Sequence, residues 1–236
     1  MRLLCLETAT SAAAVSLVDK DRVLAEVVAS TDRHHTESLL PAASAVLEAA
    51  GWKVADLEGV VVDIGPGLFT GLRVGVTTAR SLAMAAGISI IAVTSLEVLA
   101  NDPATVGAEQ VLSIVDARRG ELFIQTFEGP FGDRRAVGSP EIVTPEALVD
   151  DVSSWDLSQK ICCVGDGALR HRDALQGLGS VHLAEVVIPS PGVAGRLAMT
   201  KAFSDPVSVV PLYLRDPDAV ANFTVAHSTA PPSSGS

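Results

Sequence analysis

The chain has 236 residues, of which 48% are apolar and 19% are charged. This length and composition can bury a sizeable core in one large domain or in two small lobes. The formal net charge of −11 argues against a protein that grips nucleic acid unaided, because such proteins present a positively charged surface. No apolar run is long enough to span a bilayer and no secretory signal is visible. The three cysteines lack the spacing of a disulfide framework, so we expect a cytoplasmic protein without membrane contact.

The first half begins with three strands and continues as alternating helices and strands. Apolar runs between polar turns predict the strands, and Ser38 and Gly51 supply start and stop signals for the first helix. In chain order we predict strands over 2–7, 12–18 and 22–30, a helix over 37–51, a strand over 59–65, a helix over 69–87, a strand over 89–95 and a short helix over 96–101.

The second half repeats this order with low sequence similarity. We predict strands over 110–117, 120–127 and 134–143, a helix over 144–152, a strand, Gly-x-Gly turn and helix over 160–179, a strand over 181–188 and a helix over 192–204. A duplicated β-β-β-α-β-α-β-α order is typical of the actin, hexokinase and Hsp70 superfamily (the ASKHA fold), whose two lobes clamp a nucleotide. We therefore expect a two-lobed α/β fold.

The expected lobes comprise residues 1–105 and 106–218. The tail over 219–236 is rich in small residues, Pro and Ser, a composition that predicts disorder. The adjacent Cys162 and Cys163 lie on a predicted strand, where their side chains should point to opposite faces of the sheet as core residues.

The first hairpin of each half is a candidate anion site in such a clamp. Acidic residues precede both turns, and the candidate contacts with a nucleotide or another anion are Thr8, Thr10, Ser11 and Arg118. The alternative for the first turn is that its hydroxyls satisfy their own backbone. The alternative for Arg118 and its neighbour Arg119 is that they are merely solvated.

Other catalytic patterns are not present in the sequence. His34 and His35 are adjacent and diverge, and no histidine has a partner at the i+4 spacing that a helical zinc site needs, so we expect no metal site. There is no G-x-S-x-G nucleophile turn. The segment 65–71, "GPGLFTG", lacks the Gly-Lys-Ser/Thr ending of a P-loop. It is either a phosphate cradle or a tight turn into the following helix.

That following helix has small residues at four-residue steps, namely Gly71, Gly75, Ala79 and Ala83. Two interior glycines weaken a helix by roughly 1 kcal/mol each, which suggests that another backbone approaches closely. The helix over 37–50 is also apolar nearly all round, whereas a surface helix normally has a wide polar face. Both helices are either buried by another subunit or deep in the core of their own.

Several segments, in their order and spacing, resemble the bacterial TsaB (YeaZ) family over residues 1 to about 219. The segments are "ETATSAAAVSL" (7–17), "HHTESLLP" (34–41), "GPGLFTGLRVGVTTARSLA" (65–83), "VTSLEVLA" (93–100), "VDARRGELF" (115–123) and "PLYLRDPDA" (211–219). The chain departs from the usual family pattern at Glu7, where the family has Asp, and at Leu68, where it has Ser. The catalytic relative, TsaD, has a metal-binding histidine pair after the equivalent of the second helix, and this chain has none over 92–102.

The resemblance implies a non-catalytic accessory subunit that helps to make threonylcarbamoyladenosine next to the tRNA anticodon. It would bind a TsaD-like catalytic subunit, dock a TsaE-like ATPase and reach tRNA mainly through the complex. ATP and a metal ion would be used by those partners and no cofactor by this chain alone. The helices over 37–50 and 69–86 would also form a homodimer.

The expected interface residues on these helices are Leu39, Leu40, Ala43, Leu47, Gly71, Arg73, Val74, Thr78 and Ser81. Arginine at Ala43 or Thr78 is expected to abolish binding to TsaD without unfolding the chain. Two alternatives remain: a small-molecule kinase or ATPase of the same superfamily, which ATP binding and turnover would reveal, and a peptidase, for which the chain lacks both a metal pair and a recognisable nucleophile.

Overall fold

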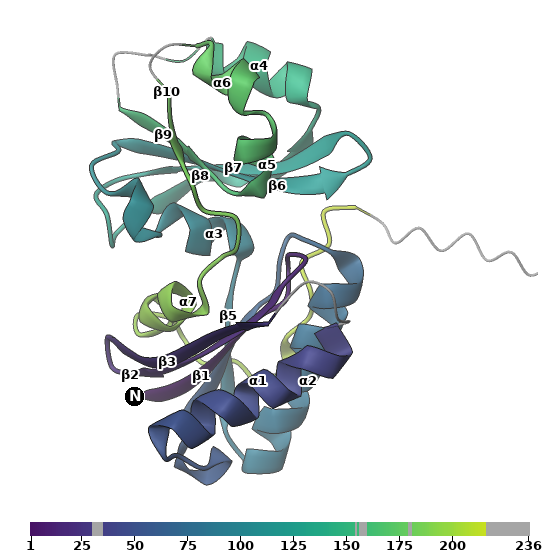
Figure 1. Ribbon diagram of the computed structural model, residues 1–236, viewed down its shortest axis with the longest axis vertical. Coiled ribbons are helices and arrows are strands. Elements are labelled where there is room, and N and C mark those ends of the chain that lie inside the picture. Colours follow the sequence, from purple (N-terminus) through teal and green to yellow (C-terminus); the bar gives the residue numbers. More distant parts are fainter. Residues whose placement is uncertain (30–34, 154, 156–159, 179–180, 216–236) are drawn as a thin grey trace, which may run out of the picture.

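The computed structural model describes residues 1–29, 35–153, 155, 160–178 and 181–215, arranged as two lobes (Figure 1). The strands are β1 (Arg2–Glu7), β2 (Ala13–Asp19), β3 (Arg22–Ala29), β4 (Gly59–Asp63), β5 (Ser89–Val93), β6 (Gln110–Arg118), β7 (Glu121–Glu128), β8 (Arg135–Val143), β9 (Ile161–Val164) and β10 (Val181–Ala184). The helices are α1 (His35–Ala50), α2 (Phe69–Ala86), α3 (Ser95–Ala100), α4 (Pro145–Ser153), α5 (Asp166–Arg170), α6 (Arg172–Gln176) and α7 (Pro191–Ala198), with short 3₁₀ turns η1 (Val54–Asp56), η2 (Pro103–Thr105) and η3 (Pro206–Ser208).

The two five-stranded sheets have the same strand order. The first runs β3-β2-β1-β4-β5 and the second runs β8-β7-β6-β9-β10, so each strand has a counterpart in the other lobe. In both sheets the first three strands of the lobe are antiparallel and the remaining two extend the sheet in parallel. The duplicated order predicted from the sequence is confirmed.

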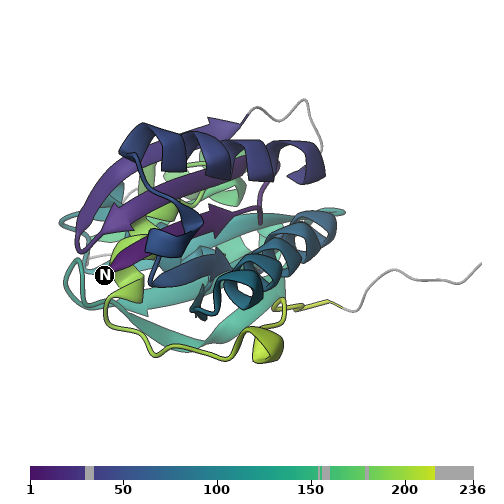
Figure 2. The same ribbon diagram turned by 90° about the horizontal axis from the view of Figure 1, so that it is seen from below.

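The first sheet is covered on both faces because alternate strand residues point to opposite sides. Leu4 and Val62 belong to the core beneath α1 and α2, which lie beside each other on one side of the molecule (Figures 1 and 2). Leu3 and Val61 belong to the opposite core, beneath α7. The first lobe therefore has helices on both sides of its sheet.

The second sheet is built in the same way. Leu112 packs with residues of α4, α5 and α6, whereas Val111 packs against α3 on the other face. Cys162 and Cys163 fall in these two different cores, as expected for neighbours on a strand. Burial raises the pKa of the Cys162 thiol to about 11 and that of Cys163 to about 12, so both are packed as neutral core residues.

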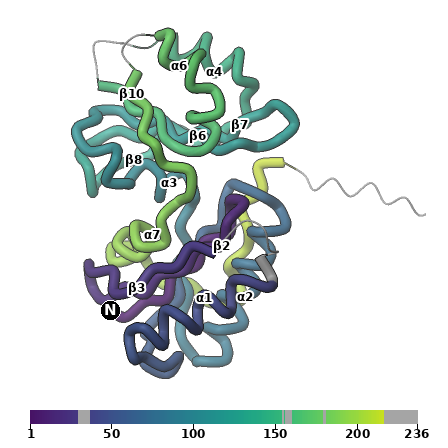
Figure 3. The backbone as a smooth tube through the Cα atoms, viewed as in Figure 1, coloured from purple at the N-terminus to yellow at the C-terminus, as the bar shows by residue number. Residues whose placement is uncertain are grey.

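The lobes exchange one helix each, as the backbone trace in Figure 3 shows. Helix α3 follows the last strand of the first sheet and packs on β6 and β7, whereas α7 follows the last strand of the second sheet and packs on β1 and β2. The boundary expected near residue 105 stays a prediction. Helix α7 nevertheless lies in the range expected for the second lobe and covers the first.

Local details differ from the sequence prediction. The helix expected within 160–179 is split into α5 and α6, because His171 between them is not helical. The helix expected over 192–204 ends at Ala198, and the following segment instead pairs Ser204 with Ile90 at the edge of the first sheet. The tail over 219–236 and His34 lie outside the described residues. No helix of the described ranges is long and apolar enough to cross a membrane.

Candidate functional site

The glycine loop after β4 is a tight turn whose polar groups are engaged by the protein itself. The Asp63 carboxylate accepts hydrogen bonds from Gly65 N (2.7 Å) and Ser95 Oγ (2.8 Å). Leu68 N donates to Ala9 O at 2.7 Å. A Cβ atom on Gly67 would lie only 2.3 Å from Ala9 O, so this glycine serves close packing against the first hairpin. Of the two interpretations of the loop, the structure favours the tight turn over the phosphate cradle.

The small-residue stripe of α2 packs inside its own lobe. Thr8 Oγ1 donates to Gly71 O at 2.8 Å, and a Cβ on Gly75 would lie 2.1 Å from the same hydroxyl. Gly71, Gly75, Ala79 and Ala83 are all buried. The close approach that the glycines indicated is therefore real, but the neighbour is the β1–β2 hairpin and not another subunit. A partner can reach only the opposite face of α2.

The hydroxyls of the first hairpin do not form an open anion site. Thr8 and Thr10 are buried, and Ser11 is exposed but is not among the residues that line the cavity described below. Glu7 Oε1 accepts the backbone N–H groups of Ala9 and Thr10 at 2.8 and 3.3 Å. The backbone of the turn is therefore satisfied by the Glu7 carboxylate, whereas the Thr8 hydroxyl binds Gly71 O of α2.

A buried pair of carboxyl groups lies beneath this hairpin. Glu7 and Asp63 end the neighbouring parallel strands β1 and β4, and both are almost fully buried. Each has one oxygen, Glu7 Oε2 and Asp63 Oδ2, that no donor of the described residues reaches. Burial raises the pKa of Glu7 well above its usual range, and the negative charge of Asp63 raises it further. A proton on Glu7 can bridge the two groups.

Sequence reasoning missed this pair because the two residues are far apart in the chain. The signal that could have found it is the parallel pairing of β1 and β4, which brings carboxylates at the two strand ends to the same edge of the sheet.

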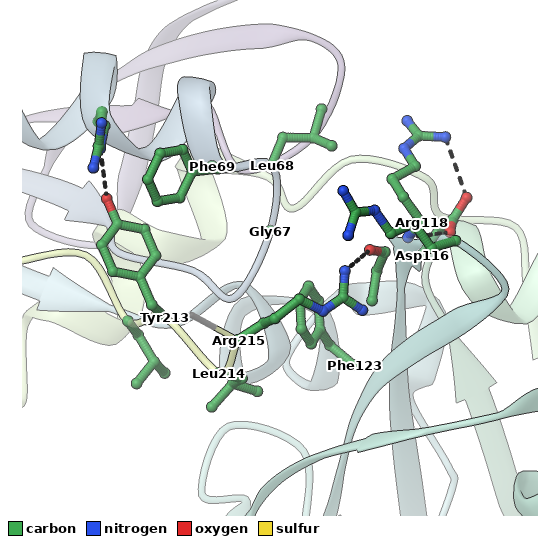
Figure 4. A pocket seen from close by; sticks show the side chains of 13 residues that line it. Gly67, Leu68, Phe69, Asp116, Arg118, Phe123, Tyr213, Leu214 and Arg215 are labelled. Carbon is green, nitrogen blue, oxygen red and sulfur yellow. Dashed lines mark hydrogen bonds and ion pairs between the residues drawn. The ribbon is translucent and has the colours of Figure 1, made fainter. Parts of the chain in front are cut away.

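A cavity of about 520 Å³ opens between the two lobes (Figure 4). Its wall is made by the start of α2, the β6–β7 hairpin and the segment after η3. It is lined by Gly67, Leu68, Phe69, Arg73, Asp116, Ala117, Arg118, Arg119, Phe123, Leu212, Tyr213, Leu214 and Arg215. Of the four expected anion contacts, only Arg118 lies here.

The outer face of α1 and α2, called the helical face from here on, is poor in charge. Its exposed members are Leu40, Pro41, Ser44, Ala45, Glu48 and Ala49 on α1 and Thr77, Ser81, Met84 and Ala85 on α2. Thr78 and Val74 are half-buried beside it. Among these exposed members only Glu48 is charged. The low-relief stripe that the sequence indicated, Gly71, Gly75, Ala79 and Ala83, is not part of the helical face because it is buried.

The structure places the expected interface residues in different surroundings. Leu40 and Ser81 are exposed on the helical face. Leu39, Ala43 and Leu47 are instead buried in the core of the first lobe, because they lie on the side of α1 that faces the sheet, and Gly71 is buried beneath Thr8. These four cannot present side-chain surface to a partner in this structure. Arg73 is exposed but lines the cavity.

Comparison with known proteins identifies the family. The family model described as TsaD, tRNA N6-adenosine threonylcarbamoyltransferase, matches residues 22–151. The TsaB protein of Bacillus subtilis, named for tRNA threonylcarbamoyladenosine biosynthesis, is 29% identical over 94% of this chain and 98% of its own length. An uncharacterized protein of Mycobacterium tuberculosis is 35% identical over 92% and 93%.

Solved structures agree with this assignment. YeaZ from Pseudomonas aeruginosa superposes with a TM-score of 0.76 at 26% identity, covering 90% of this chain and 99% of that one. The chain is a TsaB (YeaZ) member of this family. Component A of the (R)-2-hydroxyglutaryl-CoA dehydratase from Acidaminococcus fermentans shares the fold alone, with a TM-score of 0.50 at 11% identity, covering 84% of this chain and 97% of that one. The TsaB chain therefore has the duplicated ASKHA fold expected from its sequence.

Residues 92–102, where the sequence resemblance places the histidine pair of TsaD, form the end of β5 and α3 in this TsaB chain. Thr94 caps α3 by accepting a hydrogen bond from Glu97 N at 3.2 Å, and Glu97 forms an ion pair with Lys201 at 2.9 Å. Within the described ranges, no three or more His, Cys, Asp or Glu side chains are grouped so that they could hold a metal ion.

Proposed function

We propose that this TsaB chain is a non-catalytic accessory subunit in the synthesis of threonylcarbamoyladenosine in tRNA. The proposal extends the biosynthetic role named for its relatives in Bacillus subtilis and Escherichia coli. In this proposal the chain binds a TsaD-like catalytic subunit, offers a docking platform to a TsaE-like ATPase and meets tRNA mainly within the complex. ATP and a metal ion are then used by the partners.

The observation that supports a partner-binding role is the helical face. Solvent-exposed helices of a globular protein normally carry a broad charged side, yet the outer side of α1 and α2 bears little charge. The charged residues of the two helices that are at least partly exposed are Glu37, Glu48, Arg73 and Arg80. Exposed apolar side chains such as Leu40 and Met84 are the kind that a partner helix covers.

The same face offers a second copy of the chain a place to dock. A homodimer in the absence of the catalytic subunit is therefore part of the proposal, with the two occupants excluding each other. Because a two-fold interface uses the same patch on both subunits, a substitution on the helical face should weaken both assemblies.

The decisive experiment places a charge on this face without disturbing the core. Ala45→Arg and Ser81→Arg alter exposed positions, and Ala136→Arg makes the same change at an exposed position of β8. We expect the first two to weaken binding to the catalytic subunit of the same organism by at least about tenfold, because each buries an unpaired charge. The control should bind as the native chain does, as measured by calorimetry and co-purification.

If both helical-face variants bind the catalytic subunit with unchanged affinity, the interface lies elsewhere. Ala43→Arg, one of the two changes that the sequence suggested, is unsuitable because Ala43 is only 4% exposed and arginine there would disrupt the lobe. A steady-state assay of ATP hydrolysis by the isolated chain tests the alternative of a kinase or ATPase, which requires turnover without partners.

A further inference from the structure

We propose that residues 209–215 form a strap that holds the two lobes in one relative orientation. Residues 209–213 are attached to the first lobe, and residues 214 and 215 are attached to the second. The strap lies on the side of the molecule away from α7 (Figures 1 and 2). The inference concerns motion between the lobes and does not depend on the helical interface proposed above.

The first part of the strap is fixed to the first lobe by a buried side chain and by its backbone. Val209 is 5% exposed and belongs to the core beneath α1 and α2. Leu212 N donates to Ile64 O, just after β4, at 2.7 Å. These contacts hold the strap against the end of β4.

The Tyr213 side chain continues this attachment at the start of α2. Its ring centre lies 4.8 Å from that of Phe69, and its hydroxyl accepts a hydrogen bond from Arg73 Nε at 3.2 Å, drawn dashed in Figure 4. The Arg73 guanidinium in turn lies 3.8 Å from the centre of the Phe69 ring. Stacking and cation–π contacts of this kind fix the orientation of the rings, so Tyr213 is anchored to α2.

The next two residues are attached to the second lobe. Leu214 packs against the core between the second sheet and α3. Arg215 Nη1 donates to Ala117 O at 3.4 Å, and its guanidinium forms an ion pair with Glu121 of β7. In Figure 4 the side chains of Tyr213 and Arg215 extend in opposite directions. The strap therefore passes from one lobe to the other between two adjacent residues, with no free chain between its two attachments.

The place of the strap determines which motion it opposes. Two lobes that are joined along one side can rotate about that side as about a hinge, and relative motion is the normal behaviour of lobes with a small mutual interface. Helices α3 and α7 contact each other, and Glu97 pairs with Lys201 beside them at 2.9 Å. Because the strap connects the lobes away from α7, it opposes rotation about these helices.

The strap also forms part of the wall of the cavity between the lobes, since residues 212–215 belong to its lining. Its attachment to the second lobe depends on Leu214 more than on the ion pair. The Arg215 and Glu121 side chains are 27% and 38% exposed, and ion pairs that water reaches contribute little. Both Leu214 and Arg215 must therefore be changed to release the strap.

Distances between spin labels on the two lobes test the strap in the full chain. Ala55→Cys on η1 and Ala136→Cys on β8 place one label at an exposed position of each lobe. The three native cysteines are all buried, so the introduced thiols should react selectively. Labelled chain is diluted with unlabelled chain, so that labels on different copies do not contribute to the signal.

Leu214→Asn combined with Arg215→Gln removes the attachment to the second lobe. We expect pulsed electron double resonance to give one distance peak for the native strap and a distribution at least about twofold broader for this variant, because lobes without the strap can rotate. The matched control combines Val210→Asn with Arg135→Gln, which makes the same two changes at positions 61% and 83% exposed. The control should keep the native width, as surface substitutions have small effects.

Cooperative thermal unfolding shows that each variant is folded before distances are compared. If Leu214→Asn prevents folding, the milder Leu214→Ala takes its place beside Arg215→Gln. The proposal is overturned if the released strap leaves the distance distribution unchanged, or if the control broadens it as much. A native chain that already shows several distances would also contradict it.

Discussion

The Glu7 side chain makes the stability of the folded chain depend on pH. Its carboxyl is buried against that of Asp63, and two charges cannot be accommodated there without water. Burial also raises the pKa of Asp63. In the unfolded chain each group loses its proton near its ordinary pKa of about 4. The folded protein keeps a proton on the pair to higher pH, so stability falls as the pH rises from the unfolded pKa values through the raised ones.

Replacing the acid by its amide should remove this pH dependence. In Glu7→Gln the side-chain oxygen can still accept from Ala9 N and Thr10 N, while the introduced amide group donates to Asp63 Oδ2 at any pH. We expect the variant to match the native chain near pH 5 and to exceed its free energy of unfolding by about 1–3 kcal/mol at pH 9, the usual cost of an unsatisfied buried polar group. Urea unfolding between pH 5 and pH 9 measures the difference.

The matched control is Glu48→Gln, which removes the same charge from an exposed position of α1. It should keep the native dependence of stability on pH. If Glu7→Gln and the native chain lose stability in parallel as pH rises, the carboxyl pair is not the titrating unit.

The position of helix α2 is set by the contact of its glycines with the β1–β2 hairpin. The Thr8 hydroxyl occupies the space where a side chain at position 75 would lie and donates to the carbonyl of Gly71. The helix can therefore approach the hairpin more closely than an alanine-rich helix could. The weak helix propensity of glycine is offset by a buried hydrogen bond and by packing.

A double-mutant cycle tests this contact. Gly75→Ala should destabilise the chain because overpacking costs about 1–3 kcal/mol, which outweighs the gain of roughly 1 kcal/mol in helix propensity. In a Thr8→Ala background the hydroxyl is gone and the nearest atom of residue 8, its Cβ, lies at an ordinary 3.4 Å. There Gly75→Ala should be neutral or stabilising, giving a coupling of about 1–3 kcal/mol in chemical denaturation.

Ser81→Ala serves as the reference for this cycle, since it changes an exposed residue of the same helix. We expect its effect to stay within about 0.5 kcal/mol. Additive effects of Thr8→Ala and Gly75→Ala would contradict the proposed contact.

Features that depend on neighbouring residues in the chain could be predicted from the sequence, whereas contacts between residues far apart in the chain could not. Strand and helix order depends on local periodicity and turn residues, and it was confirmed for both sheets. The partner of a small-residue stripe is not a local property: Thr8 is 63 residues from Gly71, so the sequence left open whether the stripe met the hairpin or another subunit. The cavity between the lobes is lined by residues from 67 to 215. Of the four residues expected to contact an anion, only Arg118 is part of this lining.

At the scale of the whole molecule, the exchanged helices join the two lobes. Helix α7 covers the face of the first sheet that carries Leu3 and Ile91, and α3 covers the face of the second sheet that carries Val111. The two helices also contact each other, and Glu97 of α3 pairs with Lys201 just after α7. Neither lobe has a complete core from its own contiguous segment, so the two should unfold together.

Cutting the chain between the lobes should therefore leave two incomplete folds. A fragment of residues 1–105 lacks α7, and full burial of each large side chain beneath it contributes about 1.5–3 kcal/mol. We expect this fragment to bind a hydrophobic dye, to associate and to show no cooperative thermal transition by circular dichroism. Mixing it with a fragment of residues 106–215, which supplies α7 and accepts α3, should restore one transition at equimolar ratio. A monomeric 1–105 fragment that melts cooperatively alone would show instead that α7 is dispensable for the first lobe.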